Sequence, residues 1–121
     1  MCGIAGYIGK KKISKKVIEA TLKLMKNRGP DNQNCKLYKV FDLNFYMLHS
    51  RLNIIDINKR SNQPYIYKDY AIIFNGEIYN YLEIKKELEE KSIKFNTNSD
   101  TEVLLKAYLF YGLKFFQKLE G

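Results

Sequence analysis

Hydrophobic positions in the first half of the chain alternate or cluster in short runs, a pattern typical of β-strands. Residues Cys2–Ile8 alternate around small side chains and predict a first strand. Two more extended segments are predicted, roughly at Cys35–Phe41 and Phe45–Arg51. The segment Tyr70–Phe74 is apolar throughout, so we expect a strand that is buried on both faces.

Other segments carry helix signals. Ser14 is expected to cap a helix from Lys15 to about Lys26, and Gly29-Pro30 stops it. The apolar face of this helix should consist of Val17, Thr21, Leu24 and Met25.

Two later helices begin at pairs of residues spaced as capping boxes. Asn80 and Glu83 form the first pair, and Ser99 and Glu102 form the second. In the first helix, Ile84 and Leu88 follow at helical spacing. The apolar positions of the second helix are Val103, Ala107 and Tyr108, and its end is predicted at Gly112.

A last apolar segment, Leu113–Leu119, predicts another helical turn or two. Strands and helices do not alternate regularly, which argues against a doubly wound parallel sheet and for an α+β fold. The chain has 121 residues, a length that suits one domain, 1–121.

Composition narrows the class of protein. With 45% hydrophobic residues the chain can build a core, and no apolar run approaches the length of a membrane span. The basic cluster follows the first apolar segment, the reverse of a signal peptide, so we expect a cytoplasmic protein without membrane partners. Cys2 and Cys35 are far apart, which excludes a cysteine zinc cluster and disfavours a disulfide. His49 is the single histidine, so a Ser-His-Asp hydrolase or a histidine metal site is disfavoured and no metal is expected.

The net charge of +8 raises the question whether the protein binds nucleic acid. Only three of the 21 basic residues are arginines, and the lysines are scattered among Asn, Ile, Tyr and Phe. Nucleic-acid surfaces gather basic residues on one face together with base-reading or stacking groups. We therefore do not expect a nucleic-acid partner.

Cys2 could be an ordinary buried residue, but its position gives it a second interpretation. A small residue at position two permits removal of Met1, which would leave Cys2 with a thiol and a free α-amine. This amine, with a pKa of roughly 8, can accept a proton near neutral pH. A nucleophile that carries its own general base needs neither a histidine nor an aspartate.

The dipeptide Asn75-Gly76 lies between apolar runs and is a strong signal for a β-hairpin, which we favour when it is considered alone. A tight turn can also expose the Asn75 amide and the Gly76 N–H on one side. Two such donors near a thiolate would form an oxyanion hole.

Three charged residues are the remaining candidates for a functional site. Arg51 is either a surface residue beside a strand or a bidentate partner for a carboxylate. Asp100 is either an acid that complements a helix dipole or a partner for an ammonium group. Glu77 is a turn carboxylate, or a second ammonium partner. Together they offer the complementary charges that a free α-amino acid requires.

These residues occur in a specific order of motifs. The motifs are Met-Cys-Gly-Ile-Ala-Gly at 1–6, Arg-Gly-Pro-Asp at 28–31, His-Ser-Arg-Leu-Asn-Ile-Ile-Asp at 49–56, Gln-Pro at 63–64, Phe-Asn-Gly-Glu-Ile-Tyr-Asn at 74–80 and Ser-Asp-Thr-Glu at 99–102. Over its whole length the chain resembles the class II glutamine amidotransferases, and within them the glutamine-hydrolysing asparagine synthetases.

The resemblance implies an N-terminal-nucleophile hydrolase fold, a four-layer αββα sandwich that would be incomplete at the C-terminus here. The site residues that it implies are the nucleophile Cys2, the oxyanion donors Asn75 and Gly76, and the glutamine-binding residues Arg51, Glu77 and Asp100. It places Arg28-Gly29-Pro30-Asp31 in a loop near the active site, and we interpret that loop as structural.

The resemblance also implies a C-terminal synthetase domain as a partner, supplied with ammonia by this domain and using ATP and Mg²⁺. These 121 residues hold no glycine-rich pyrophosphate loop, so no cofactor is expected in this domain. A homodimer is compatible with the resemblance. Two alternatives stay open: an amidotransferase with another ammonia acceptor, such as a sugar carboxylate, and a catalytically inactive truncated module.

Overall fold

The helices and strands divide between two units of the computed structural model, which describes every residue from Met1 to Gly121. The first unit comprises Met1–Asn53 and Asn62–Asn75, and the second comprises Ile54–Ser61 and Gly76–Gly121. The elements of the first unit are β1 (Gly3–Gly9), α1 (Lys15–Met25), β2 (Asn32–Val40), β3 (Leu43–Arg51), β4 (Tyr65–Tyr67) and β5 (Tyr70–Ile72). Those of the second are the 3₁₀-helix η1 (Lys59–Ser61), α2 (Tyr81–Glu90), α3 (Asp100–Tyr111) and the 3₁₀-helix η2 (Leu113–Lys118). Helices and antiparallel strands occur together, which confirms the α+β class.

The first unit is built on a three-stranded antiparallel sheet with the order β1-β3-β2. β3 is the central strand, and its register with β1 pairs Gly3 with Ser50. Its register with β2 pairs Asn32 with Arg51. The three predicted strands are confirmed. The start of β1, the start of β2 and the end of β3 therefore lie at the same end of the sheet.

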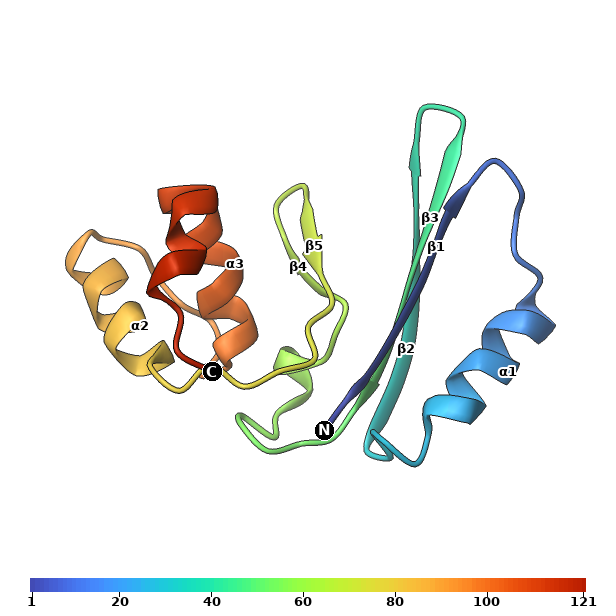
Figure 1. Cartoon of the computed structure of the whole chain (residues 1–121), viewed down its shortest axis with the longest axis horizontal. Helices are drawn as coiled ribbons and strands as arrows, with labels where there is room; N and C mark the ends of the chain where they lie inside the picture. The colour runs from blue at the N-terminus through green and yellow to red at the C-terminus, as the bar shows by residue number, and fades with distance from the viewer. The chain divides into compact units, whose positions relative to one another are not determined.

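Successive side chains of β3 point to opposite faces of this sheet. On one face, the Tyr46 hydroxyl accepts a hydrogen bond from the backbone N–H of Ile13, just before α1 (3.1 Å). On the other face, His49 Nε2 lies 3.3 Å from the carbonyl oxygen of Phe74, just after β5. Figure 1 accordingly shows α1 and the β4–β5 hairpin on opposite sides of the sheet.

The predicted helix that begins after Ser14 is confirmed as α1, and the Ser14 hydroxyl accepts a hydrogen bond from Val17 N. Its predicted apolar face is partly wrong, because Val17 and Leu24 are 53% and 85% exposed. The partly shielded stripe is instead rotated and includes Ile18 and Leu22 together with Met25. Met25 packs against the backbone of Gly3, where an added Cβ would lie 3.1 Å from the Met25 Cβ.

The strand predicted at Tyr70–Phe74 is confirmed over Tyr70–Ile72, but its predicted burial on both faces is wrong. β5 ends at Ile72, and Tyr70 is 47% exposed because this short strand pairs only with β4. No strand follows Asn75-Gly76, so the favoured hairpin at this dipeptide is wrong as well. The hairpin turn lies earlier, at Lys68, whose φ of 54° is in the left-handed region.

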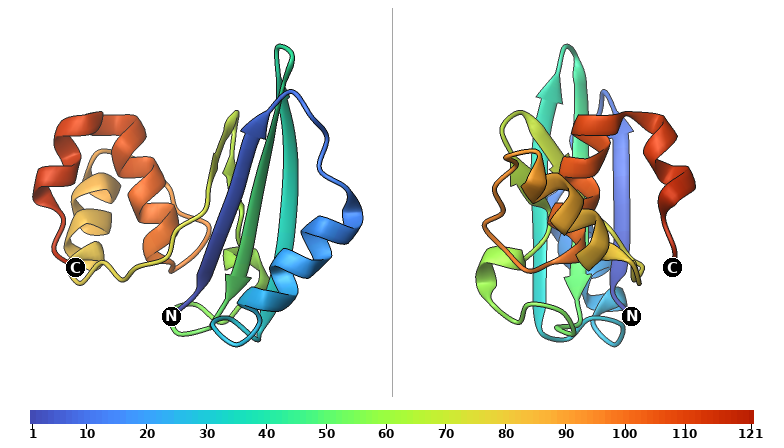
Figure 2. Two further views of the ribbon diagram at one scale, coloured as in Figure 1. Left: turned by 45° about the vertical axis from the view of Figure 1, so that its right-hand side comes forward. Right: turned by 90° about the vertical axis from the view of Figure 1, so that its left-hand side faces the viewer.

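The second unit packs α2, α3 and η2 around its own small core, and α2 lies beside α3 in Figure 2. The buried apolar side chains of this core are Ile78, Ile84, Leu88, Val103, Leu104, Leu105, Ala107 and Phe115. The predicted end of α3 at Gly112 is confirmed, and its φ of 70° is one that glycine adopts without strain. No helix in the chain combines the length and apolarity that crossing a bilayer requires.

Both helices of the second unit begin where the sequence predicts, but neither has a complete capping box. The Asn80 side chain makes no cap hydrogen bond to α2 and instead bonds to the backbone of Lys118 and Glu120. Ser99 does cap α3 through Thr101 N (3.1 Å). Glu102 does not return to Ser99, because its carboxylate is occupied by other partners, described below.

Candidate active site

Cys2 lies immediately before β1, and its thiol is partly shielded from solvent. The backbone N–H of Leu52 donates to Cys2 Sγ at 3.4 Å, and the Leu52 carbonyl oxygen lies 3.8 Å from the same sulfur. Arg28 Nε donates a hydrogen bond to the Cys2 carbonyl oxygen at 3.1 Å. The antiparallel register of β1 with β3 thus brings the thiol to the residue that follows Arg51.

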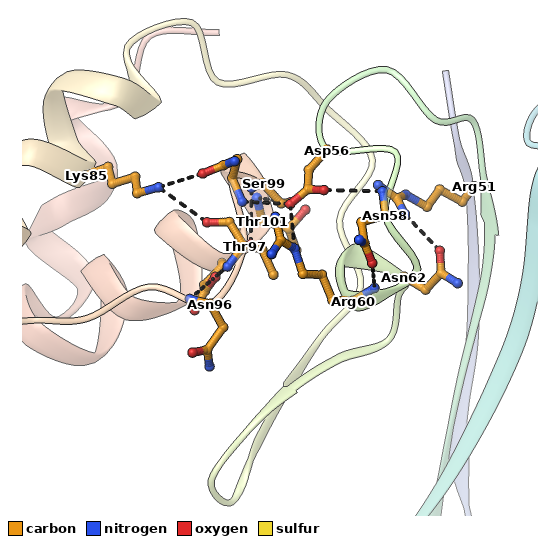
Figure 3. Close-up of polar contacts among 12 residues, drawn as sticks. Arg51, Asp56, Asn58, Arg60, Asn62, Lys85, Asn96, Thr97, Ser99 and Thr101 are labelled. Carbon is orange, nitrogen blue, oxygen red and sulfur yellow. Dashed lines mark hydrogen bonds and ion pairs between the residues drawn. The ribbon is translucent and has the colours of Figure 1, made fainter.

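Arg51, the last residue of β3, is only 4% exposed, so the alternative of a surface arginine is wrong. Its Nη1 donates to the side-chain oxygen of Asn62 at 2.8 Å, a contact drawn in Figure 3. The buried guanidinium of Arg51 provides a fixed cationic fork on the residue that precedes Leu52, whose backbone contacts the thiol. Such a fork is suited to a carboxylate ligand.

The Arg28–Asp31 motif packs against the same end of the sheet and is hydrogen-bonded to it. Gly29 lies so close to β3 that an added Cβ would be 2.1 Å from the carbonyl oxygen of Ser50. Asp31 N donates to the Arg51 carbonyl oxygen (3.0 Å), and the Asp31 carboxylate accepts from Asn53 N (2.7 Å). These contacts agree with our structural interpretation of the motif.

Asn75 also belongs to the first unit and is partly buried. It follows Phe74, whose backbone N–H donates to Gln63 Oε1 at 2.5 Å and whose carbonyl oxygen faces His49 Nε2. The backbone before Asn75 is therefore held by two side chains and not by a neighbouring strand.

The other predicted site residues, Gly76, Glu77 and Asp100, belong to the second unit. Asp100 is the first residue of α3 and is 6% exposed, and its Oδ2 accepts from the backbone N–H of Ile78 at 3.3 Å. Burial raises the pKa of Asp100, the N–H groups of Ile78 and Thr101 oppose this shift, and the charge of Glu77 raises the pKa further. Two carboxylates in one neighbourhood form an anionic site that suits an ammonium group.

Two carboxylates that sequence reasoning did not identify, Glu102 and Asp56, accept hydrogen bonds from the backbone of the segment before Asp100. Glu102 is fully buried and accepts hydrogen bonds from Asn96 N (3.0 Å), Thr97 N (2.7 Å) and Thr97 Oγ1 (2.6 Å). It also forms an ion pair with the buried Lys106 at 2.6 Å. The i,i+4 spacing of Glu102 and Lys106 was the signal that could have revealed this pair.

Asp56 is the second carboxylate that holds this segment, and its contacts are drawn in Figure 3. It accepts a hydrogen bond from Asn98 N at 2.7 Å and pairs with Arg60 at 3.3 Å. Burial would raise the pKa of Asp56, but the N–H groups of Asn98 and Asn58 and the charge of Arg60 hold that pKa at about 2. The carboxylate therefore stays ionised and fixes the backbone two residues before Asp100.

No group of three or more His, Cys, Asp or Glu side chains lies close enough together to hold a metal ion. The arrangement offers a shielded thiol and a buried arginine in one unit and a pair of carboxylates in the other.

A family model described as a glutamine amidotransferase domain matches the chain over residues 1–121. The chain belongs to this family. It is 40% identical over its full length to asparagine synthetase [glutamine-hydrolyzing] 1 of Bacillus subtilis, and 34% identical to putative asparagine synthetase [glutamine-hydrolyzing] 2 of Methanocaldococcus jannaschii. Amidase chry2 of Gibberella zeae is also 34% identical over the full chain. The amidotransferase domain spans 20%, 26% and 20% of the lengths of these relatives, respectively.

Proposed function

We propose that this amidotransferase domain hydrolyses glutamine to glutamate and ammonia, with Cys2 as the nucleophile. The ammonia would pass to a synthetase domain that amidates aspartate with the use of ATP. The observation that carries the proposal is the family match over the whole chain, together with a shielded Cys2 thiol beside the end of β3 and its buried Arg51.

The reaction requires that Met1 is removed, so that Cys2 carries a free α-amine. The thiol proton passes to this amine, and the sulfur attacks the side-chain carbonyl carbon of glutamine. The Asn75 amide and the Gly76 N–H stabilise the negative oxygen of the tetrahedral intermediate. The carbon–nitrogen bond breaks as the ammonium proton moves to the leaving nitrogen, which releases ammonia and leaves a γ-glutamyl thioester.

Water then attacks the thioester and gives a proton to the same amine. The carbon–sulfur bond breaks, glutamate leaves, and the thiolate recovers its proton. No other general base is needed.

Arg51 would bind the α-carboxylate of glutamine, and Asp100 with Glu77 would bind its α-ammonium group. The burial of Arg51 supports the first role, because a desolvated guanidinium binds an anion more strongly than an exposed one. The burial of Asp100 and its proximity to the charge of Glu77 support the second. A bound ammonium group would lower the raised pKa of Asp100.

The same proposal includes the N-terminal-nucleophile hydrolase fold. Two antiparallel sheets in the first unit, with α1 on the outer face of the larger one, agree with part of a four-layer αββα sandwich. The remaining strands and the synthetase domain would follow in the intact protein. A cytoplasmic location and a homodimer stay predictions.

One observation favours a second candidate for the ammonia acceptor. The relative named amidase chry2 matches the chain as fully as the relative from M. jannaschii does. An amidotransferase with an acceptor other than aspartate would use the same glutaminase residues. The inactive module remains the third alternative.

The test is intact and peptide mass spectrometry after treatment with a diazoketone analogue of glutamine. We expect one adduct on Cys2, protection by excess glutamine, and loss of Met1. Cys2→Ala should abolish the adduct and the glutaminase activity. Cys35→Ala is the matched control, because Cys35 is the other free, partly buried thiol, and it should change neither. An unlabelled Cys2 in protein that lacks Met1 would refute the proposal.

A further inference from the structure

The backbone of Phe74 is held in an unusual way. β5 has already ended at Ile72, so Phe74 has no strand partner. Its N–H donates to Gln63 Oε1 at 2.5 Å, and its carbonyl oxygen lies 3.3 Å from His49 Nε2. Both polar groups of one residue are thus bound by side chains from two other segments of the first unit.

His49 is the more constrained of the two side chains. It lies on the central strand β3, between Ile4 of β1 and Asn34 of β2, and is 0% exposed. Because a carbonyl oxygen can only accept, Nε2 must carry the proton in this contact. Burial lowers the pKa of His49, the bond to Phe74 opposes this shift, and the charge of Arg51 lowers the pKa further. The ring is therefore the neutral Nε2–H tautomer.

The other ring nitrogen, Nδ1, is buried without a hydrogen-bond partner. An unsatisfied buried nitrogen costs free energy, so Nδ1 gives no reason for a histidine at this position. The use of a histidine here is explained by what its Nε2–H does. That group binds the carbonyl oxygen of the peptide bond between Phe74 and Asn75.

Gln63 holds the preceding peptide bond. Its side chain is buried, with 5% exposed, and its Oε1 accepts the Phe74 N–H. Because peptide units are planar, bonds to the N–H and the carbonyl oxygen of one residue fix the planes on both sides of it. The second of these planes carries the backbone nitrogen of Asn75.

We infer that His49 and Gln63 are positioning residues for glutamine hydrolysis, which fix the Phe74 backbone and hence the oxyanion-binding residue Asn75. The inference rests on the proposed function. A preorganised oxyanion donor acts only if it stands where the charge develops. A displacement of about 1 Å can reduce the rate by about 100-fold. Neither side chain needs to touch glutamine for this effect.

The experiment compares kcat and KM for glutamine with the alkylation of Cys2 by the diazoketone. We expect His49→Phe and Gln63→Met to lower kcat by about 10- to 100-fold. KM should change less than about threefold, because Arg51 and Asp100 are unaltered. Alkylation of Cys2 needs the nucleophile and the substrate pocket, so its rate should stay near that of the parent.

Two further variants distinguish positioning from general damage. His49→Gln can place an amide N–H near the position of Nε2, so its kcat should be clearly higher than that of His49→Phe and closer to that of the parent. Tyr38→Phe is the control on β2, since it removes a buried hydroxyl that has no hydrogen-bond partner, and it should leave kcat unchanged.

The outcomes separate this inference from the proposed function. A parent protein that neither hydrolyses glutamine nor is alkylated refutes the proposed function, and the inference fails with it. An active parent with fully active His49→Phe and Gln63→Met variants overturns the inference alone. Variants that lose Cys2 alkylation together with kcat also overturn it, because the defect is then structural and not one of positioning.

Discussion

Replacing Glu102 with glutamine removes one charge from the most deeply buried ion pair of the protein. Glu102 is 0% exposed and its partner Lys106 is 3% exposed, with 2.6 Å between Oε1 and Nζ. The same carboxylate accepts the N–H groups of Asn96 and Thr97, so it holds the segment before α3. The substitution keeps the size of the side chain and changes its charge.

The expected loss follows from what the substitution leaves behind. Lys106 would remain buried as a cation, with the Lys94 carbonyl oxygen and the ring of Phe95 (4.9 Å to the centroid) as its other contacts. Removing one partner of a buried ion pair typically costs about 3–5 kcal/mol. Glutamine can still accept one hydrogen bond, so we expect about 3 kcal/mol. For a domain of this size, that corresponds to a fall in Tm of roughly 12 °C or more.

The assay is urea unfolding of the parent and the variant at neutral pH, monitored by far-UV circular dichroism. A lower midpoint with an unchanged m-value would show a loss of stability without a change in the surface exposed on unfolding. Glu19→Gln is the matched control, because Glu19 pairs with Lys15 at the same i,i+4 spacing but with side chains 63% and 89% exposed. Its cost should be about 0.5 kcal/mol or less.

A double variant isolates the role of the buried cation of Lys106. Adding Lys106→Met to Glu102→Gln removes the buried positive charge and should recover much of the lost stability. Equal midpoints for Glu102→Gln and Glu19→Gln would refute the reasoning, because they would mean that the buried ion pair contributes no more than an exposed one.

Three other substitutions test separate features. Gly29→Ala places a Cβ 2.1 Å from the carbonyl oxygen of Ser50, and should cost about 3 kcal/mol or prevent folding; an unchanged urea midpoint would contradict this close approach. Asp56→Asn removes a carboxylate whose pKa is about 2, so it should lower the stability at pH 7 by up to about 2 kcal/mol. Because that stability is lost as the carboxylate is protonated, the gap to the parent should close as the pH falls from 3.8 toward about 2, and a gap that does not depend on pH would contradict the assignment. Asp100→Asn should raise the urea midpoint at pH 7, because burial raises the pKa of Asp100 and its ionised form therefore destabilises the folded state. This gain in stability over the parent should shrink as the pH falls through the pKa of Asp100. The same variant should lose glutamine hydrolysis, and a lower midpoint would refute this account.

The amino-acid sequence was sufficient to predict most of the helices and strands. Alternation around small side chains predicted the first strand of the larger sheet, and two extended segments predicted the other two strands. Ser14 and Ser99 marked the starts of two helices, and Gly112 marked the end of α3. Each of these signals acts between residues a few positions apart, where backbone geometry and capping decide the outcome. The order of the motifs was also sufficient to indicate the amidotransferase family, which the family match over the whole chain confirms.

The hydrogen-bond partners of the buried polar residues depend on the folded structure. Asn75-Gly76 has the local chemistry of a hairpin, yet the Phe74 backbone before it is bound by His49 and Gln63. Glu102 has the spacing of a capping residue, yet it binds Thr97 and Lys106. Most buried polar groups are hydrogen-bonded, and a partner that is distant in the sequence can satisfy such a group better than a nearby one once the chain is folded. Periodicity cannot show such choices, because they depend on which segments the packed fold brings together.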